Sequence, residues 1–122
     1  MSAYQRFPTQ IWLALAISAC GGAPLNQAKL TEVNTALHAA ETLGADQDPK
    51  AKQSLDSARK EIAEAQRLGK EGDGQKGDLH LARALSDANL ASQQARTKHE
   101  EELAREAWAK SKSGATASAP QQ

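Results

Sequence analysis

The chain has 122 residues, and its 15 Lys and Arg side chains balance 15 Asp and Glu side chains, so the formal net charge is zero. This length suits one small domain, and the charge balance excludes the basic surface that nucleic-acid-binding proteins need. Aromatic residues make up only 3% of the sequence, and alanine outnumbers the larger apolar residues after position 20. Alanine-rich helices bury little area each, so we expect no deep pocket for a small-molecule substrate.

The first 19 residues have the layout of an export signal. Arg6 and the free amine precede an apolar run, Ile11 to Ile17, and two small residues end the segment. The run is shorter than the roughly 20 apolar residues of a membrane-spanning helix. We therefore predict a signal peptide over residues 1–19, with cleavage between Ala19 and Cys20.

The residues around this boundary, Ile17-Ser18-Ala19-Cys20, resemble the lipobox of bacterial lipoproteins, in which an aliphatic and two small residues precede an invariant, lipidated cysteine. The resemblance implies acyl chains on Cys20, and two or more chains anchor a protein stably because each buried CH₂ contributes about 0.8 kcal/mol. An aspartate after the cysteine favours retention in the inner membrane of such proteins. Gly21 stands there, which implies an outer-membrane anchor facing the periplasm. The alternatives are an ordinary secretory signal with an incidental cysteine and, more weakly, a permanent membrane span.

The remainder predicts an all-α fold, an antiparallel helical hairpin or three-helix bundle in residues 27–111. Residues 20–26 are expected to form a lipidated, flexible tether. Asn26 caps a first helix over residues 27–43, and Gly44 follows it. Asp48 and Pro49 open a second helix, to about residue 68, whose small and apolar residues repeat every three or four positions in a heptad-like, coiled-coil seam.

Four glycines between residues 69 and 77 predict a flexible reversal, after which Asp78 caps a third helix that ends near Ser111. Its apolar stripe stops near Thr97, so the rest of this long helix is expected to project from the bundle. Two i,i+4 ion pairs, Glu101 with Arg105 and Glu106 with Lys110, support the projecting part. Residues 112–122 lack a hydrophobic face and are expected to be a disordered tail.

No catalytic, metal or cofactor site is expected. The glycine-rich stretch lacks the P-loop spacing and the calcium-loop pattern. His38, His80 and His99 lack metal-ligand spacing. The three consecutive glutamates that begin at Glu100 form a solvated face, since no cleft holds two carboxylates together. Enzymes also need a nucleophile or ligand set, which this sequence does not offer.

Leu103, Ala107 and Trp108 form a thin apolar strip on the predicted projection, and Trp108 is the only aromatic residue after Cys20. A lone tryptophan there either anchors a protein partner or packs on its own helix, and both interpretations stay open.

Three stretches, residues 38–49, 58–65 and 77–91, resemble a family of short, alanine-rich helical bacterial lipoproteins of unknown function, some joined to an OmpA-like peptidoglycan-binding domain. The resemblance covers residues 30–96 and implies a helical envelope protein. The chain differs by an extra loop, Lys70 to Lys76, and by lacking the OmpA-like domain, so peptidoglycan binding is not implied.

Two functions follow from these observations. The first is a non-enzymatic, lipid-anchored envelope protein that presents a helical surface to an envelope protein partner. The alternative is a structural spacer that self-associates as a coiled coil, as the trimeric murein lipoprotein does. That lipoprotein ends in a lysine linked to peptidoglycan, whereas this sequence ends in Gln121-Gln122.

Overall fold

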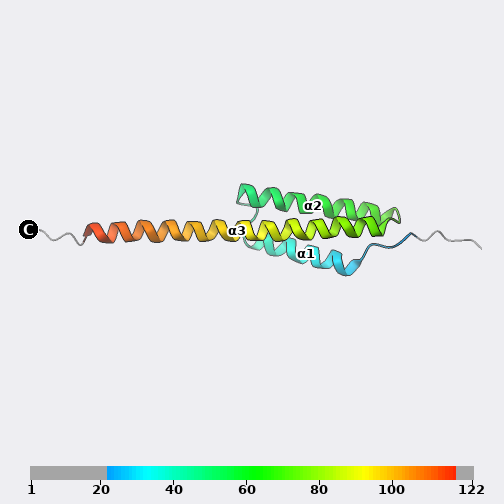
Figure 1. Cartoon of the computed structure of the whole chain (residues 1–122), viewed down its shortest axis with the longest axis horizontal. Coiled ribbons are helices and arrows are strands. Elements are labelled where there is room, and N and C mark those ends of the chain that lie inside the picture. Colours follow the sequence, from blue (N-terminus) through cyan, green and yellow to red (C-terminus); the bar gives the residue numbers. More distant parts are fainter. Residues whose placement is uncertain (1–21, 118–122) are drawn as a thin grey trace, which may run out of the picture.

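Helices account for nearly all of residues 22–117, the part of the chain that the computed structural model describes. α1 spans Gln27–Thr42, α2 spans Pro49–Lys70 and α3 spans Gly74–Ala117. α2 and α3 run antiparallel, and α1 flanks α3 on another side (Figure 1). α3 packs extensively against both other helices, whereas α1 and α2 contact each other little. The all-α fold is confirmed, with α3 as the central helix.

α1 and α2 begin where the sequence predicts them, and α1 ends at Thr42, one residue before the predicted end. The Asn26 side chain accepts a hydrogen bond from the Lys29 N–H at 3.1 Å. Asp48 accepts from the N–H groups of Lys50 and Ala51 at 3.0 and 2.9 Å. These bonds satisfy N–H groups that lack a partner inside the helix. Gly44, just past α1, has a φ of 81°, which a residue with a side chain rarely adopts.

The predicted reversal over residues 69–77 is wrong in extent. α2 continues to Lys70 and α3 begins at Gly74, so only three residues connect them. Gly72 has a φ of 85°, and the Asp73 N–H donates to the Leu68 carbonyl at 2.9 Å, which closes the last turn of α2. Asp78 does not cap α3, because it lies inside that helix, where its carboxylate accepts from the Asn26 N–H at 3.0 Å.

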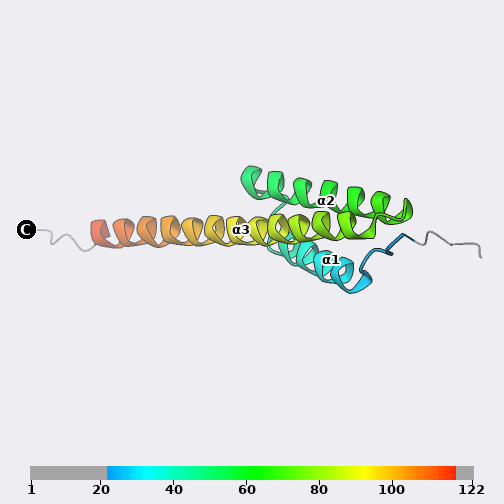
Figure 2. The same cartoon turned by 45° about the vertical axis from the view of Figure 1, so that its right-hand side comes forward.

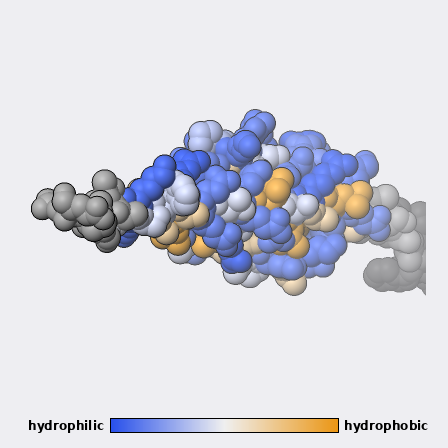
Figure 3. All heavy atoms as spheres, turned by 60° about the vertical axis from the view of Figure 1, so that its left-hand side comes forward, coloured by the Kyte–Doolittle hydropathy of each residue, from blue (hydrophilic) through white to orange (hydrophobic). Residues whose placement is uncertain are grey.

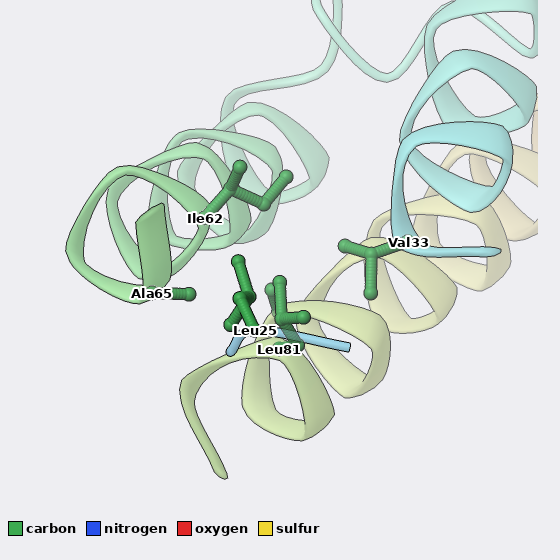
Figure 4. Close-up of a cluster of buried hydrophobic side chains, with 6 residues drawn as sticks. Leu25, Val33, Ile62, Ala65 and Leu81 are labelled. Atoms are coloured by element: carbon green, nitrogen blue, oxygen red, sulfur yellow. The ribbon is translucent and has the colours of Figure 1, made fainter. Parts of the chain in front are cut away.

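The predicted tether is also shorter than expected, since part of it belongs to the fold. We call residues 22–26 the strap. Leu25 is 9% exposed and lies between Ile62 and Ala65 of α2 and Leu81 of α3, with Val33 of α1 beyond (Figure 4). The Ala23 carbonyl accepts from the Gly74 N–H at 2.9 Å. The folded domain therefore begins at the strap rather than at α1.

A second buried cluster lies toward the other end of the bundle and consists mainly of alanines around Leu55 of α2. Beyond it α3 continues alone, which confirms the predicted projection (Figure 2). Its end at Ala117 corrects the expectation of disorder from residue 112, because residues 112–117 are helical. The predicted signal peptide, Cys20 and the last five residues lie outside the described residues.

Candidate functional site

The bundle ends where the core-facing side of α3 changes from alanine to charge. Ala88, Ala91 and Ala95 are buried and repeat at three- and four-residue spacing. The next positions on the same side are Lys98 and Glu102, which cannot enter an apolar core without a large desolvation cost. This change explains physically why neither α1 nor α2 covers α3 beyond Ala95.

Every side chain from His99 to Gly114 is exposed. Arg105 and Glu101 form the predicted i,i+4 pair at 3.8 Å, and Lys98 pairs with Glu102 at 3.6 Å. Glu106 and Lys110 do not come within ion-pair distance, so that prediction is wrong. Exposed pairs of this kind contribute only a few tenths of a kcal/mol each, or about 0.5 kcal/mol at most. The projecting half of α3 thus depends on its own helical bonds and on a few weak pairs.

The structure places all three predicted docking residues on this projecting half. Leu103 is 52% exposed, Trp108 is 65% exposed, and Ala107 is exposed between them. At 3.6 residues per turn the three cover about 140° of the helix circumference. Ala107 lies about 120° around the helix from Ala95, so the strip is offset from the alanine seam of α3. Leu103 follows Leu85 by five full turns and therefore lies in line with a residue that packs against the core, but α1 ends at Thr42 and does not reach it.

Trp108 also contacts its own helix. The Lys112 Nζ lies 5.2 Å from the centroid of the Trp108 ring, which is cation–π geometry. This contact covers part of one face of the ring, and about two-thirds of the side chain stays open to solvent. The two interpretations of the sequence are therefore compatible, because the ring leans on α3 and still offers area to a partner.

The sequence analysis missed two further exposed apolar residues of α3, Leu79 and Leu90, which are 63% and 44% exposed. They precede Trp108 by 29 and 18 residues, so all three lie within about 20° of one line along α3. Leu90 borders an open groove of about 610 Å³ between the start of α2 and α3, which polar residues such as Gln93 and Gln94 also line. The spacings of 11 residues from Leu79 to Leu90 and of 18 from Leu90 to Trp108 could have revealed this line. The three- and four-residue repeat of the buried residues is the stronger pattern in α3 and concealed it.

Elsewhere the surface is predominantly hydrophilic, and hydrophobic side chains form only separate small patches on the face seen in Figure 3. Ion pairs on α2 perturb two carboxyl groups there. Hydrogen bonding from Lys52 and Arg59 lowers the pKa of Asp56, and hydrogen bonding from Arg67 lowers the pKa of Glu64. Both carboxylates are exposed partners of ordinary ion pairs rather than poised acids or bases.

The three histidines are not gathered with other potential ligands into a metal site within the described residues. His38 is exposed and its Nδ1 lies 3.6 Å from Glu41, while the His80 Nδ1 is 2.5 Å from the Glu61 carboxylate. Within residues 22–117 no group of three or more potential ligands could hold a metal ion. Over the same residues no helix is long and apolar enough to cross a membrane.

No family model, curated protein or solved structure matches this chain. The resemblance to alanine-rich lipoproteins therefore stays a prediction from the residues that carry it. The geometry leaves one candidate functional site in the described part of the chain: the apolar strip on the uncovered half of α3, with Leu79 and Leu90 along the same helix.

Proposed function

We propose that this chain is a lipid-anchored, non-enzymatic envelope protein that presents the projecting half of α3 to a protein partner. Its anchor is Cys20, acylated after removal of residues 1–19, and its location is the periplasmic side of the outer membrane. The observation that carries the docking role is the exposed strip of Leu103, Ala107 and Trp108 on the half of α3 that neither α1 nor α2 covers.

The anchor is supported by the order of residues before Cys20, namely a positive start, an apolar run and two small residues. An unpaired cysteine in an exported chain also needs an explanation, and acylation supplies one. The family resemblance points the same way.

Docking through the strip is supported by the type and position of its residues. Tryptophan is enriched at the centres of protein interfaces, where it buries a large area with little loss of conformational freedom. The strip lies beyond Ala95, where substitution cannot disturb the core of the bundle. A partner could therefore cover the strip without any change in the fold.

The docking role is tested with a photo-cross-linking residue placed at Ala107 in the full-length chain, in its native cells. Ala109 provides the matched control, because it is also an exposed alanine but lies about 160° away around α3. We expect one discrete cross-linked protein from position 107 that is lost when Trp108→Ala is added. Equal cross-linking from both positions, or none from position 107, contradicts a docking strip.

The anchor is tested separately by mass spectrometry of the protein purified from native membranes. An acylated residue at position 20 with no preceding residues is expected, and Cys20→Ala should release the protein from the membrane fraction. An unmodified cysteine or an intact Met1 would exclude the anchor while leaving the docking strip to be judged on its own result.

A further inference from the structure

The strap holds the start of the described chain firmly against one end of the bundle. Ala23 pairs with Asp73 through the 2.9 Å bond from the Gly74 N–H to the Ala23 carbonyl. The Asn26 N–H donates to the Asp78 carboxylate at 3.0 Å, and the Lys29 ammonium lies 3.7 Å from the same carboxylate. Polar contacts thus fix the strap at two points along the first turns of α3.

Glycines make room for this contact. A Cβ at Gly22 would lie 2.1 Å from the Gly72 carbonyl oxygen, and a Cβ at Gly77 would lie 2.6 Å from Leu25 Cδ1 and 2.9 Å from the Ala65 carbonyl. Atoms cannot approach so closely, so only glycine permits the strap to pass the α2–α3 turn with Leu25 in the core. Gly77 therefore serves close packing, and Gly72 serves the tight turn through its positive φ, rather than flexibility.

The docked strap determines which end of the molecule an anchor would hold. Gly22 contacts Gly72 in the α2–α3 turn. Cys20 precedes Gly22 by two residues, and two residues of chain span at most about 7 Å. An acylated Cys20 therefore leaves no tether long enough to let the bundle turn its other end to the membrane.

We propose that a lipid headgroup surface covers the α2–α3 turn of this protein and that α3 leads away from it, which holds the Trp108 strip on the order of 50 Å from the membrane. This inference rests on the proposed lipid anchor. The occupant is a bilayer because the chain that leaves the strap ends two residues later at the proposed acylation site.

The charges at the turn fit this orientation. Lys76 pairs with Asp73 at 2.7 Å and Arg67 with Glu71 at 2.5 Å, so the surface offers paired charges that can exchange with lipid headgroups. On the projecting half, Glu101 and Glu102 pair with Arg105 and Lys98, so its charges are balanced and the orientation depends on the short tether.

The test uses the mature, lipidated protein, which begins at Cys20, in vesicles of phosphatidylethanolamine and phosphatidylglycerol that carry a headgroup acceptor dye. Donor dyes are attached through Gln75→Cys at the turn or through Ala109→Cys on the projection, both at exposed positions. Because Cys20 is acylated, each variant has a single reactive thiol. Energy transfer from position 75 should be at least several-fold stronger than from position 109.

A flexible insertion of about ten Gly and Ser residues between Gly21 and Gly22 is the matched control, because it lengthens the tether by up to about 35 Å and leaves the strap intact. It should reduce transfer from position 75 while the helicity stays the same. Equal transfer from the two positions, or no effect of the insertion, overturns the orientation even if the protein binds the vesicles. Failure of the protein to sediment with vesicles instead overturns the anchor, and the orientation with it.

Discussion

Leu25→Ala tests whether the strap is part of the cooperative fold. Leu25 is the largest side chain of the strap and is 9% exposed, in contact with helices α2 and α3. The substitution removes three carbon atoms from this site. At about 0.8 kcal/mol for each buried carbon, the lost transfer free energy is about 2 kcal/mol.

A cavity would add to this loss, and core Leu→Ala substitutions cost about 2–5 kcal/mol in total. The strap lies at the start of the domain and can release instead of leaving an empty cavity, so we expect a value near the lower end, about 2–3 kcal/mol. For a domain of this size each kcal/mol shifts the melting temperature by about 4–8 °C. The expected decrease is therefore about 10–20 °C.

Thermal unfolding of a chain that begins at Gly21, followed by circular dichroism, measures this decrease. Leu79→Ala is the matched control, because Leu79 is 63% exposed and its truncation should change the stability by no more than about 0.5 kcal/mol. If Leu25→Ala and Leu79→Ala shift the melting temperature equally, the strap contributes nothing to stability and the argument from its burial is refuted.

Three further predictions address other parts of the fold. Gly77→Ala should lower the melting temperature because its Cβ would collide with Leu25. At Gly114 a Cβ meets nothing within 4 Å, so Gly114→Ala should raise helicity slightly without lowering the melting temperature. Equal changes in melting temperature for the two variants would contradict the close packing at Gly77. The pKa of Glu64 is held below its ordinary 4.5 by Arg67, so this stabilisation is present above pH 4.5 and is lost as the pH falls through the folded-state pKa. Arg67→Gln should therefore weaken the acid-induced decrease in melting temperature, and an unchanged pH profile would count against the pair. Trp108→Ala should leave the melting temperature within a few degrees of that of the parent protein, since the Trp108 side chain is 65% exposed. A large decrease in melting temperature with unchanged cross-linking from position 107 would instead make Trp108 a packing residue.

Several local features of the fold follow from the sequence because they depend on neighbouring residues. Asn26 and Asp48 can cap helices wherever they stand, since their side chains accept hydrogen bonds from N–H groups two or three residues later. Gly44 ends α1 because it adopts a positive φ at little cost. The projection of α3 was predictable for a similar reason, because the loss of the apolar stripe beyond Ala95 is visible in the sequence alone.

Contacts between distant segments were not predictable. Four glycines close together are typical of a loose loop, yet at Gly77 the deciding factor is the approach of Leu25 and of the Ala65 carbonyl, which no local pattern reveals. Asp78 has the properties of a helix cap, but tertiary packing assigns it to the Asn26 N–H instead.

The sequence by itself thus determined the helices, most of their ends and the uncovered strip around Trp108, because periodicity and capping are properties of short segments. Only the tertiary structure decided that residues 22–26 are a docked strap, because burying Leu25 requires α2 and α3 to meet around it. That single packing event also determines which end of the molecule lies next to the proposed anchor at Cys20.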